Sequence, residues 1–312
     1  MNILRTVGLV ALLHFAASAA AVDWSKVDGE EVVLFYPGQA AWEWVLTQSD
    51  HSGNEKFRKG KDCRDCHKGE QNDMGSKIVK GEKLEPHPIP GKRPSIALSV
   101  KAAHDSERLY LRFEWPKFSG SVDKKMDPDV ETRVTVMLDD GKVVEATRAG
   151  CWGTCHADLQ GMARAKDGSK LTKYLAASRT KITRDGGDEN YKSAGDLDKL
   201  VKDGVFMEFW QAELNSGQPP KAVDGYILDK RHENGSPSVS AEGGLEGDNW
   251  VVVLSRTLKS PGTGHKDIVP GKTYSLGFAI HDAYADHRYH HVSFHSTLVL
   301  DSGKADLVAK NQ

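Results

Sequence analysis

The feature that most constrains the fold of this chain is a series of segments in which apolar and polar residues alternate. Two of them, SIALSVKAAHD at 95–105 and RLYLRFEW at 108–115, flank a short polar turn, which is the pattern of a β-hairpin. The alternation recurs in TRVTVML (132–138), VVEAT (143–147), NWVVVLSR (249–256), TYSLGFAIHD (273–282) and HVSFHSTLVL (291–300). Because alternation with a period of two gives a strand one buried and one exposed face, residues 95–300 predict a mainly β fold, an immunoglobulin-like β-sandwich.

Two stretches inside this region lack the strand pattern. Residues 165–204 and 211–248 are polar, and we expect them to be excursions from the sandwich. Within the first of them, GDLDKLVKDG at 195–204 predicts one short helix.

The stretch before the sandwich has a different character. EVVLFY at 31–36 predicts a strand, but HSGNEKFRKGKD at 51–62 is a polar loop and KLEPHPIPGKRPS at 83–95 is a proline-rich linker. We therefore expect a small, irregular or helical segment at 22–90, followed by the sandwich domain at 91–304.

The first 21 residues have the parts of an export signal. Arg5 gives a positively charged start, an apolar run extends from Val7 to Ala17, and small residues precede Val22. The apolar run is too short to span a bilayer comfortably, and no later stretch reaches about 18 consecutive apolar residues. We expect residues 1–21 to be removed and the mature chain to be periplasmic, without a transmembrane segment. A retained N-terminal anchor is the alternative.

The overall charge excludes one class of partner. The chain has 42 Lys and Arg against 44 Asp and Glu, a net charge of −2, so it has no basic surplus of the kind that binds nucleic acid. We therefore expect no nucleic-acid partner.

All four cysteines lie in two short clusters, and a histidine follows each cluster directly. The first cluster, CRDCH at 63–67, is Cys-x-x-Cys-His, the attachment motif of c-type haem. In this motif two thiols add to the haem vinyl groups as thioethers, and the next histidine is held under the iron as an axial ligand. The sequence therefore predicts that Cys63 and Cys66 attach a haem whose iron binds His67.

The second cluster, CWGTCH at 151–156, has one more residue between its cysteines. Because the porphyrin fixes the positions of the vinyl groups, the longer loop must bulge, and Gly153 makes such a bulge easier. We interpret it as a stretched attachment motif in which Cys151 and Cys155 hold a second haem and His156 binds its iron. The expected cofactors are two covalently attached haem c groups.

Other arrangements of the four cysteines are a zinc site, two local disulfides, or a thioredoxin-like redox pair in one cluster. None of these requires a histidine directly after the second cysteine of both clusters. Haem attachment therefore explains more of the pattern than they do.

The strand segments resemble a known family. VKAAHDSERLYLRFEW, ETRVTVML, GVFMEFWQAEL and LGFAIHDAYADHRYHHVSFHSTLVL are similar, in this order, to strands of the haem-binding subunit of ethylbenzene dehydrogenase and related domains. The resemblance covers roughly residues 85–302, so the first cysteine cluster precedes it. It implies a sandwich that holds one haem b between a methionine and a lysine near the C-terminus, and that delivers electrons from a molybdenum enzyme.

This sequence departs from the family at both ligand positions. GCWGTCH stands where the methionine segment would fall, and YHHVS stands where the lysine would fall, with His290 as the best match. The resemblance therefore implies a member whose haem is covalently bound and has two histidine ligands. As a whole, the chain is similar to exported dihaem c-type cytochromes related to this family.

Each haem needs a second axial ligand. For the first haem we expect His51, which lies twelve residues before Cys63 in a loop that can fold back over the iron. His87, which stands between two prolines, and Met74 are its competitors, and methionine would give a higher potential.

For the second haem, strand alternation places His290 on one face with Val292, Phe294, Leu298 and Leu300. We expect this apolar face to line the haem, which makes His290 the ligand. His291, on the opposite face, is the fallback.

Trp152, Trp210 and Phe278 are candidates to pack on haem faces. For Trp210 and Phe278, packing in the ordinary core is the favoured alternative. His281 stands where the family has a tryptophan, and we expect it to be a packing or surface residue.

If both irons have six ligands, no substrate can reach them. The expected function is therefore electron transfer between redox partner proteins, such as a periplasmic or membrane-bound quinol-oxidising cytochrome or a molybdenum oxidoreductase. The chain would work alone or as a docked subunit. The alternative is a haem enzyme, a peroxidase or small-anion reductase, whose open iron is served by a cluster of His281, His287, Arg288, His291 and His295.

Overall fold

The structure of the chain is a computed structural model, and it describes residues 22–38, 42–49, 51–85, 87–122, 126–153, 174–182, 190–286 and 289–312. The predicted export signal lies outside these residues. So do Cys155 and His156 of the second cysteine cluster.

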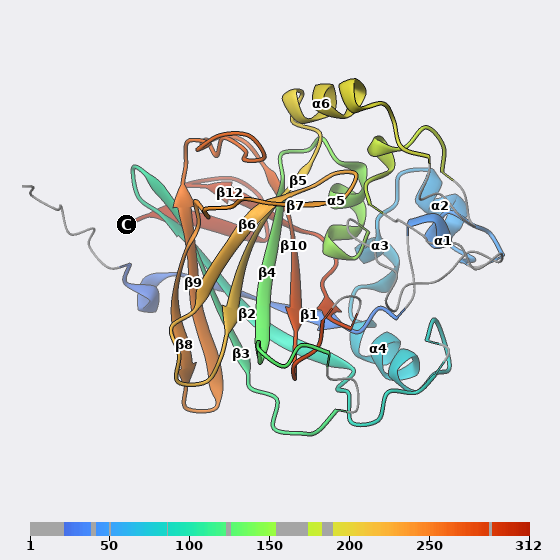
Figure 1. Cartoon of the computed structure of the whole chain (residues 1–312), viewed down its shortest axis with the longest axis horizontal. Helices are drawn as coiled ribbons and strands as arrows, with labels where there is room; N and C mark the ends of the chain where they lie inside the picture. Colours follow the sequence, from blue (N-terminus) through green and yellow to red (C-terminus); the bar gives the residue numbers. More distant parts are fainter. Residues whose placement is uncertain are drawn as a thin grey trace, which may run out of the picture.

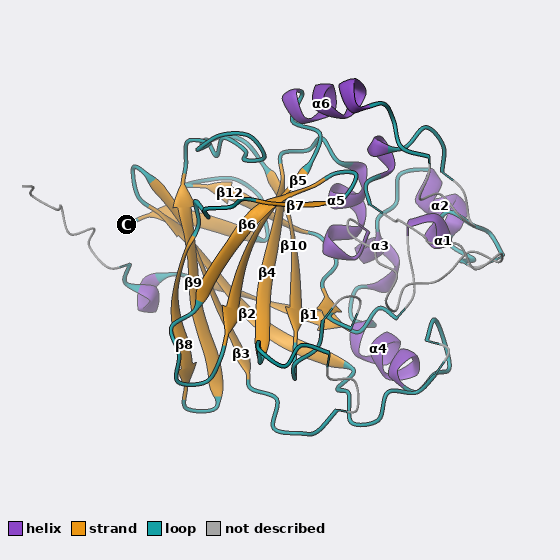
Figure 2. Cartoon of the chain, in the orientation of Figure 1, coloured by secondary structure: helices purple, strands orange, loops and turns teal. Residues whose placement is uncertain are grey.

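The described chain is mainly β, as the alternation predicts (Figures 1 and 2). The strands are β1 (Gly29–Phe35), β2 (Ser95–His104), β3 (Arg108–Pro116), β4 (Thr132–Asp139), β5 (Met207–Leu214), β6 (Lys221–Ile227), β7 (Arg231–Glu233), β8 (Ser240–Glu246), β9 (Asn249–Thr257), β10 (Tyr274–His281), β11 (His291–Val292), β12 (Ser296–Leu300) and β13 (Leu307–Asn311).

These strands form one hydrogen-bonded sheet in the order β7-β6-β5-β4-β10-β11-β1-β2-β3-β9-β8, and β12 and β13 form a second connection between β10 and β2. The two halves of the sheet share a single core, in which the rings of Phe113 on β3 and Phe278 on β10 are 5.9 Å apart. Trp210 and Phe278 are fully buried in this core, which confirms the prediction for both residues. The halves of the sheet therefore face each other across one apolar interior.

The α-helices gather on one side of the sheet, whereas the first 3-10 turn lies at its other end (Figures 1 and 2). They are α1 (Trp42–Val45), α2 (Asn54–Arg58), α3 (Cys63–His67), α4 (Gln71–Val79), α5 (Val144–Ala149) and α6 (Ala194–Lys202), with 3-10 turns η1 (Trp24–Lys26), η2 (Gly150–Gly153) and η3 (Ala176–Ser178). Among the described residues, none of these helices is long and apolar enough to cross a membrane.

The strand predicted at 143–147 is wrong, because this segment begins the helix α5. The carboxylate of Asp139 accepts hydrogen bonds from the backbone N–H groups of Gly141 (2.8 Å) and Val143 (3.1 Å) and turns the chain out of β4. The glutamate, alanine and arginine that follow favour a helix.

The polar stretch at 211–248 is not an excursion, since half of β5 and all of β6, β7 and β8 lie in it. β8 shows why the strand signal is weak: it is an edge strand, and none of its residues is fully buried. The short helix predicted at 195–204 is confirmed as α6, whose N-cap Ser193 accepts a hydrogen bond from the N–H of Asp196.

β1 belongs to the same sheet as the later strands, although it comes from the N-terminal segment. It pairs along its length with β2, and Phe35 at its end also pairs with Val292 of β11. Because of this pairing, helices α1–α4, which follow β1, lie at the edge of the sheet where β10 and β11 end. The candidate site lies there.

Candidate functional site

The first cysteine cluster forms the short helix α3. Asp62 caps its start: the carboxylate of Asp62 accepts from the N–H of Asp65 (2.9 Å), and the carboxylate of Asp65 accepts from the N–H of Asp62 (3.1 Å). Helical spacing then brings the side chains at positions i, i+3 and i+4, which are Cys63, Cys66 and His67, to one side of the turn. Cys63 is buried and Cys66 is exposed.

Arg64, between the two cysteines, fastens α3 to the C-terminal strands. Its guanidinium donates two hydrogen bonds to Asp306 (2.8 and 2.9 Å) and a third to the backbone carbonyl of His295 (3.2 Å). Asp306 also accepts from the N–H and hydroxyl of Thr297 (2.8 and 2.9 Å). Burial alone would raise the pKa of Asp306, but the hydrogen bonds from Arg64 and Thr297 outweigh it and lower the pKa to about 2.

His51 lies opposite His67, with the two ring centres 6.1 Å apart. The Nδ1 of His51 is 3.2 Å from the carbonyl oxygen of Val45, and the Nδ1 of His67 is 2.9 Å from a carboxylate oxygen of Glu70. A histidine that binds a metal usually donates its other ring N–H to such an acceptor. Both imidazoles therefore keep their Nε2 for a metal, and bonds of about 2 Å to one ion between them place the ring centres about 6 Å apart.

The two histidines and both cysteines line a cavity of about 320 Å³. This volume lies at the lower end of the range for ligand sites, about 300–1,000 Å³. The cavity walls are largely apolar and aromatic, and include Phe35, Trp44, Phe57, Met74, Trp152 and Phe294. A flat, apolar cofactor with a metal at its centre suits such a space.

The residues around the first cysteine pair match neither a disulfide nor a zinc site. Burial, together with the nearby Asp62 carboxylate, raises the pKa of Cys63 to about 12. Cys63 and Cys66 are not joined to each other. No cluster of three or more metal-binding His, Cys, Asp or Glu residues occurs in the described part of the chain. The residues present fit a covalently attached haem.

The competitors of His51 differ in position. His87 is exposed and does not line the cavity, whereas Met74, on α4, does. Burial lowers the pKa of His51, which favours the neutral imidazole that a metal needs. The ring of His51 lies opposite that of His67, with the ring centres 6.1 Å apart, and this position favours His51 over His87 and Met74.

The second cluster begins in the turn η2, directly after α5, where Cys151 and Trp152 are both buried. This turn presses on the sheet: a Cβ at Gly277 of β10 would lie 2.1 Å from the backbone nitrogen of Cys151. Gly150 has a φ of +70°, and a Cβ there would lie 2.5 Å from the backbone nitrogen of His295. The turn is therefore held tightly against β10 and the chain after β11.

The continuous strand predicted at 291–300 is wrong, because β11 ends at Val292 and β12 begins at Ser296. Between these two strands, the even-numbered side chains change the side of the sheet on which they pack. Phe294 packs in the cluster around the first cysteine motif, whereas Leu298 and Leu300 lie in the core of the sheet. His290 therefore does not share one face with all of these residues.

His290 is buried, and its ring centre is 4.7 Å from that of His281 at the end of β10. This pairing does not follow from the strand pattern, and the one available signal that position 281 faces the interior was the tryptophan that the related family has there. His291, the fallback ligand, is also buried, and its Nε2 is 2.8 Å from the carbonyl oxygen of Arg93. Burial holds the pKa of His291 well below its usual range.

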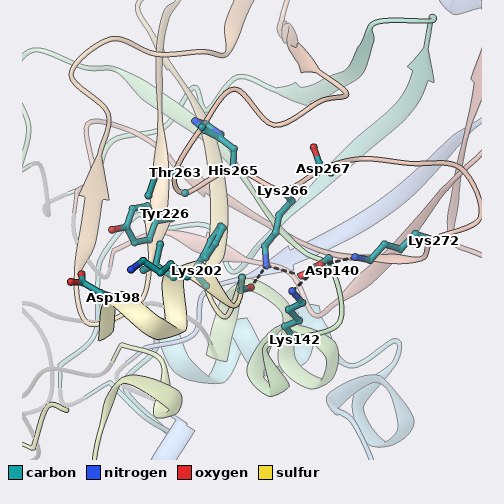
Figure 3. A pocket seen from close by; sticks show the side chains of 15 residues that line it. Asp140, Lys142, Asp198, Lys202, Tyr226, Thr263, His265, Lys266, Asp267 and Lys272 are labelled. Atoms are coloured by element: carbon teal, nitrogen blue, oxygen red, sulfur yellow. Dashed lines mark hydrogen bonds and ion pairs between the residues drawn. The ribbon is translucent and has the colours of Figure 1, made fainter. Parts of the chain in front are cut away.

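A larger cavity of about 590 Å³ has a different chemistry (Figure 3). Its charged groups pair with one another: the Nζ of Lys266 lies 2.7 Å from a carboxylate oxygen of Asp140, and the Nζ of Lys272 lies 2.6 Å from the other. Lys266 also donates to the carbonyl of Gly204 (2.6 Å). None of the described cysteines lines this cavity, and we assign its charges a structural role.

Comparison with known proteins places the chain in a family. Residues 21–238 match the Ethylbenzene dehydrogenase family. The match includes the segment before residue 85 and ends before the last strands. A Cytochrome c-552 of Stutzerimonas stutzeri is 40% identical over 303 residues, which cover 96% of this chain and 94% of that protein. A Cytochrome c-551 of Rhodocyclus tenuis is 28% identical over 298 residues, which cover 94% of this chain and 100% of that protein.

A solved carbohydrate binding module family 9 from Caldicellulosiruptor kristjanssonii, in complex with cellotriose, matches 72% of this chain and 78% of its own at 7% identity. The TM-score of 0.30 is too low to indicate a shared function. The family match and the 40% identity instead show that the chain belongs to the ethylbenzene dehydrogenase family, as a relative of cytochromes c-552 and c-551.

Proposed function

We propose that this chain is a periplasmic dihaem c-type cytochrome that relays electrons between redox proteins. The observation that carries the proposal is the Cys63–His67 turn, with His51 opposite His67 across an apolar cavity. The names of the two relatives support a c-type cytochrome that acts in electron transfer.

In the first site, Cys63 and Cys66 would hold the haem, and His67 and His51 would bind its iron. A haem supplies a one-electron change between ferric and ferrous iron. The protein's part is to orient the two imidazoles, through the carbonyl of Val45 and the carboxylate of Glu70, and to keep water from the iron with aromatic walls. Two histidine ligands close the iron to substrates and favour a lower potential than histidine with methionine.

In the second site, Cys151 and Cys155 would hold the haem, with His156 and His290 as axial ligands. The buried position of Cys151 against β10 supports this proposal, as does the buried His290 that follows the same strand. His291 is the competing ligand, because its Nε2 lies 2.8 Å from the backbone carbonyl oxygen of Arg93 and its buried Nδ1 has no hydrogen-bond partner among the described residues.

The partners we propose are periplasmic or membrane-bound redox proteins, such as a quinol-oxidising cytochrome or a molybdenum oxidoreductase. The edge of the first site that carries the exposed Cys66 is where such a partner would come close to a haem.

The test is electron paramagnetic resonance of the oxidised protein, with haem content measured by mass spectrometry. We expect two haems and two low-spin signals, with one signal changed to high spin in His51→Ala and the other in His290→Ala. His87→Ala, at an exposed histidine outside the cavity, is the control and keeps both signals. Low-spin signals retained in both ligand variants would refute these ligands. A high-spin haem in the native protein that binds cyanide readily would favour a haem enzyme instead.

A further inference from the structure

The second cysteine cluster touches the first site. Trp152, the residue directly after Cys151, is only 5% exposed and lines the same cavity as His51, Cys63 and His67. Adjacent Cα atoms are about 3.8 Å apart. A single residue step therefore separates an attachment point of the second haem from a wall of the first haem site.

We propose that Trp152 is shared by both haem sites, so that the two haems form one closely coupled pair. The inference rests on the proposed dihaem function and adds to it the relation between the cofactors.

The turn that carries Trp152 is packed from three directions. Gly277 of β10 leaves no room for a side chain against the backbone of Cys151, and Gly150 leaves none against the backbone at Phe294 and His295. On the side of the N-terminal helices, a Cβ at Gly153 would lie 3.2 Å from the Trp42 ring. The turn cannot move away from either haem site without disturbing the sheet or α1.

Aromatic side chains continue from Trp152 around the first site. Phe294, in the same cavity, has its ring centre 6.4 Å from that of His67. Trp42, behind Gly153, has its ring 5.2 Å from Phe57, another wall residue. Packed aromatic side chains therefore lie between the cavity of the first site and the turn of Cys151, and such a short path through protein favours electron transfer between the haems.

The exposure of the two sites differs as well. Cys66 is exposed and the side chain of His67 is 33% exposed, whereas Cys151 is 1% exposed. In the coupled pair, the first haem is therefore the one that meets a partner at this edge, and Cys151 marks the buried end.

The first measurement uses the unmodified protein. In the fully oxidised state, two neighbouring low-spin ferric centres broaden each other's paramagnetic signals. We expect the signal of the first haem to be broadened, and to sharpen when the second haem is reduced or is removed by Cys151→Ser with Cys155→Ser. Two haems by mass spectrometry without any broadening would overturn the inference while leaving the proposed function intact. A single haem would overturn both.

The second measurement compares two tryptophans of the same cavity. Trp44 lies beside His51, with ring centres 5.4 Å apart, and is not part of the second cluster. We expect Trp152→Phe to shift the signals of both haems, and Trp44→Phe to shift the signal of the first haem only. If Trp152→Phe alters one haem alone, Trp152 is not shared.

Discussion

At the scale of single residues, the two histidines of the first site are held by acceptors of different charge. His51 faces the neutral carbonyl of Val45, whereas His67 faces the carboxylate of Glu70. A carboxylate that accepts from an imidazole N–H makes the imidazole a stronger donor to the metal. Stronger donation stabilises ferric iron and lowers the potential of the haem.

Replacing Glu70 by Gln keeps a hydrogen-bond acceptor near His67 and removes its charge. We expect the potential of one haem to rise by up to about 60 mV. For a one-electron couple, this shift corresponds to a tenfold change in the ratio of the affinities of the histidine ligand for ferric and ferrous iron. The low-spin signal should persist. Potentiometric titration measures the shift, and Glu55→Gln, at a carboxylate on α2 that pairs with Lys59, is the matched control. An equal shift in both variants would contradict the assigned role of Glu70.

The ion pair of Arg64 with Asp306 gives a second residue-scale prediction. In the folded chain the pKa of Asp306 is lowered from 3.8 to about 2, so the carboxylate contributes stability above pH 4 and loses it as the pH falls from about 4 to about 2. Asp306→Asn should lower the stability at pH 7 by about 1–2 kcal/mol.

The pH dependence distinguishes this effect from simple loss of packing. The difference in melting temperature between the native protein and Asp306→Asn should shrink as the pH falls from 4 to 2. A difference that stays constant over this range would show that the charge of Asp306 does not stabilise the fold.

At the scale of elements, the turn η2 depends on a glycine that a side chain cannot replace. Gly150 combines a φ of +70° with a close approach to the backbone of His295. This approach places the second cysteine cluster against the sheet, so the turn that begins this cluster is positioned by the chain around Phe294, which lines the cavity of the first site.

Gly150→Ala should lower the melting temperature and reduce attachment of the second haem. Gly217→Ala is the matched control, because Gly217 has a φ of +75° but open space around its Cβ position. In the control, the free energy of unfolding should fall only by the cost of the left-handed conformation, about 1–2 kcal/mol. Haem content and thermal unfolding measure both effects. Equal losses in the two variants would mean that the close approach to His295 is unimportant.

At the scale of the whole molecule, charge is distributed unevenly. Residues 51–93 contain eleven Lys and Arg against seven Asp and Glu, although the whole chain has two more acidic than basic residues. Lys56 and Lys61 line the cavity of the first site and are exposed. A positive surface beside a haem edge attracts negatively charged redox partners.

Lys56→Glu with Lys61→Glu should slow reduction of the first haem by ascorbate, an anion, by roughly 2- to 10-fold at low salt. The effect should fade at high salt, where charges on the surface are screened. Stopped-flow absorbance measures the rate. Lys202→Glu, on α6 and lining the other cavity, is the control with no expected change.

The first site could be predicted from the sequence to a large extent, because its attachment motif is local. The segment of helix α5, by contrast, alternates like a strand at its start, and the chain turns into the helix where Asp139 accepts hydrogen bonds from the N–H groups of Gly141 and Val143. The break at 293–295 was missed for a similar reason: the residues on either side of it are apolar at every second position, and the reversal depends on packing against two different clusters.

The sequence by itself determined the mainly β class and the Cys-x-x-Cys-His motif at Cys63, Cys66 and His67, because both follow from residues close together along the chain. Only the tertiary structure decided that His51 faces His67 and that Trp152, far along the chain, lines the same cavity. The physical reason is that β1 pairs with β2 and β11 in one sheet, and this pairing brings the N-terminal helices against the turn that carries the second cluster.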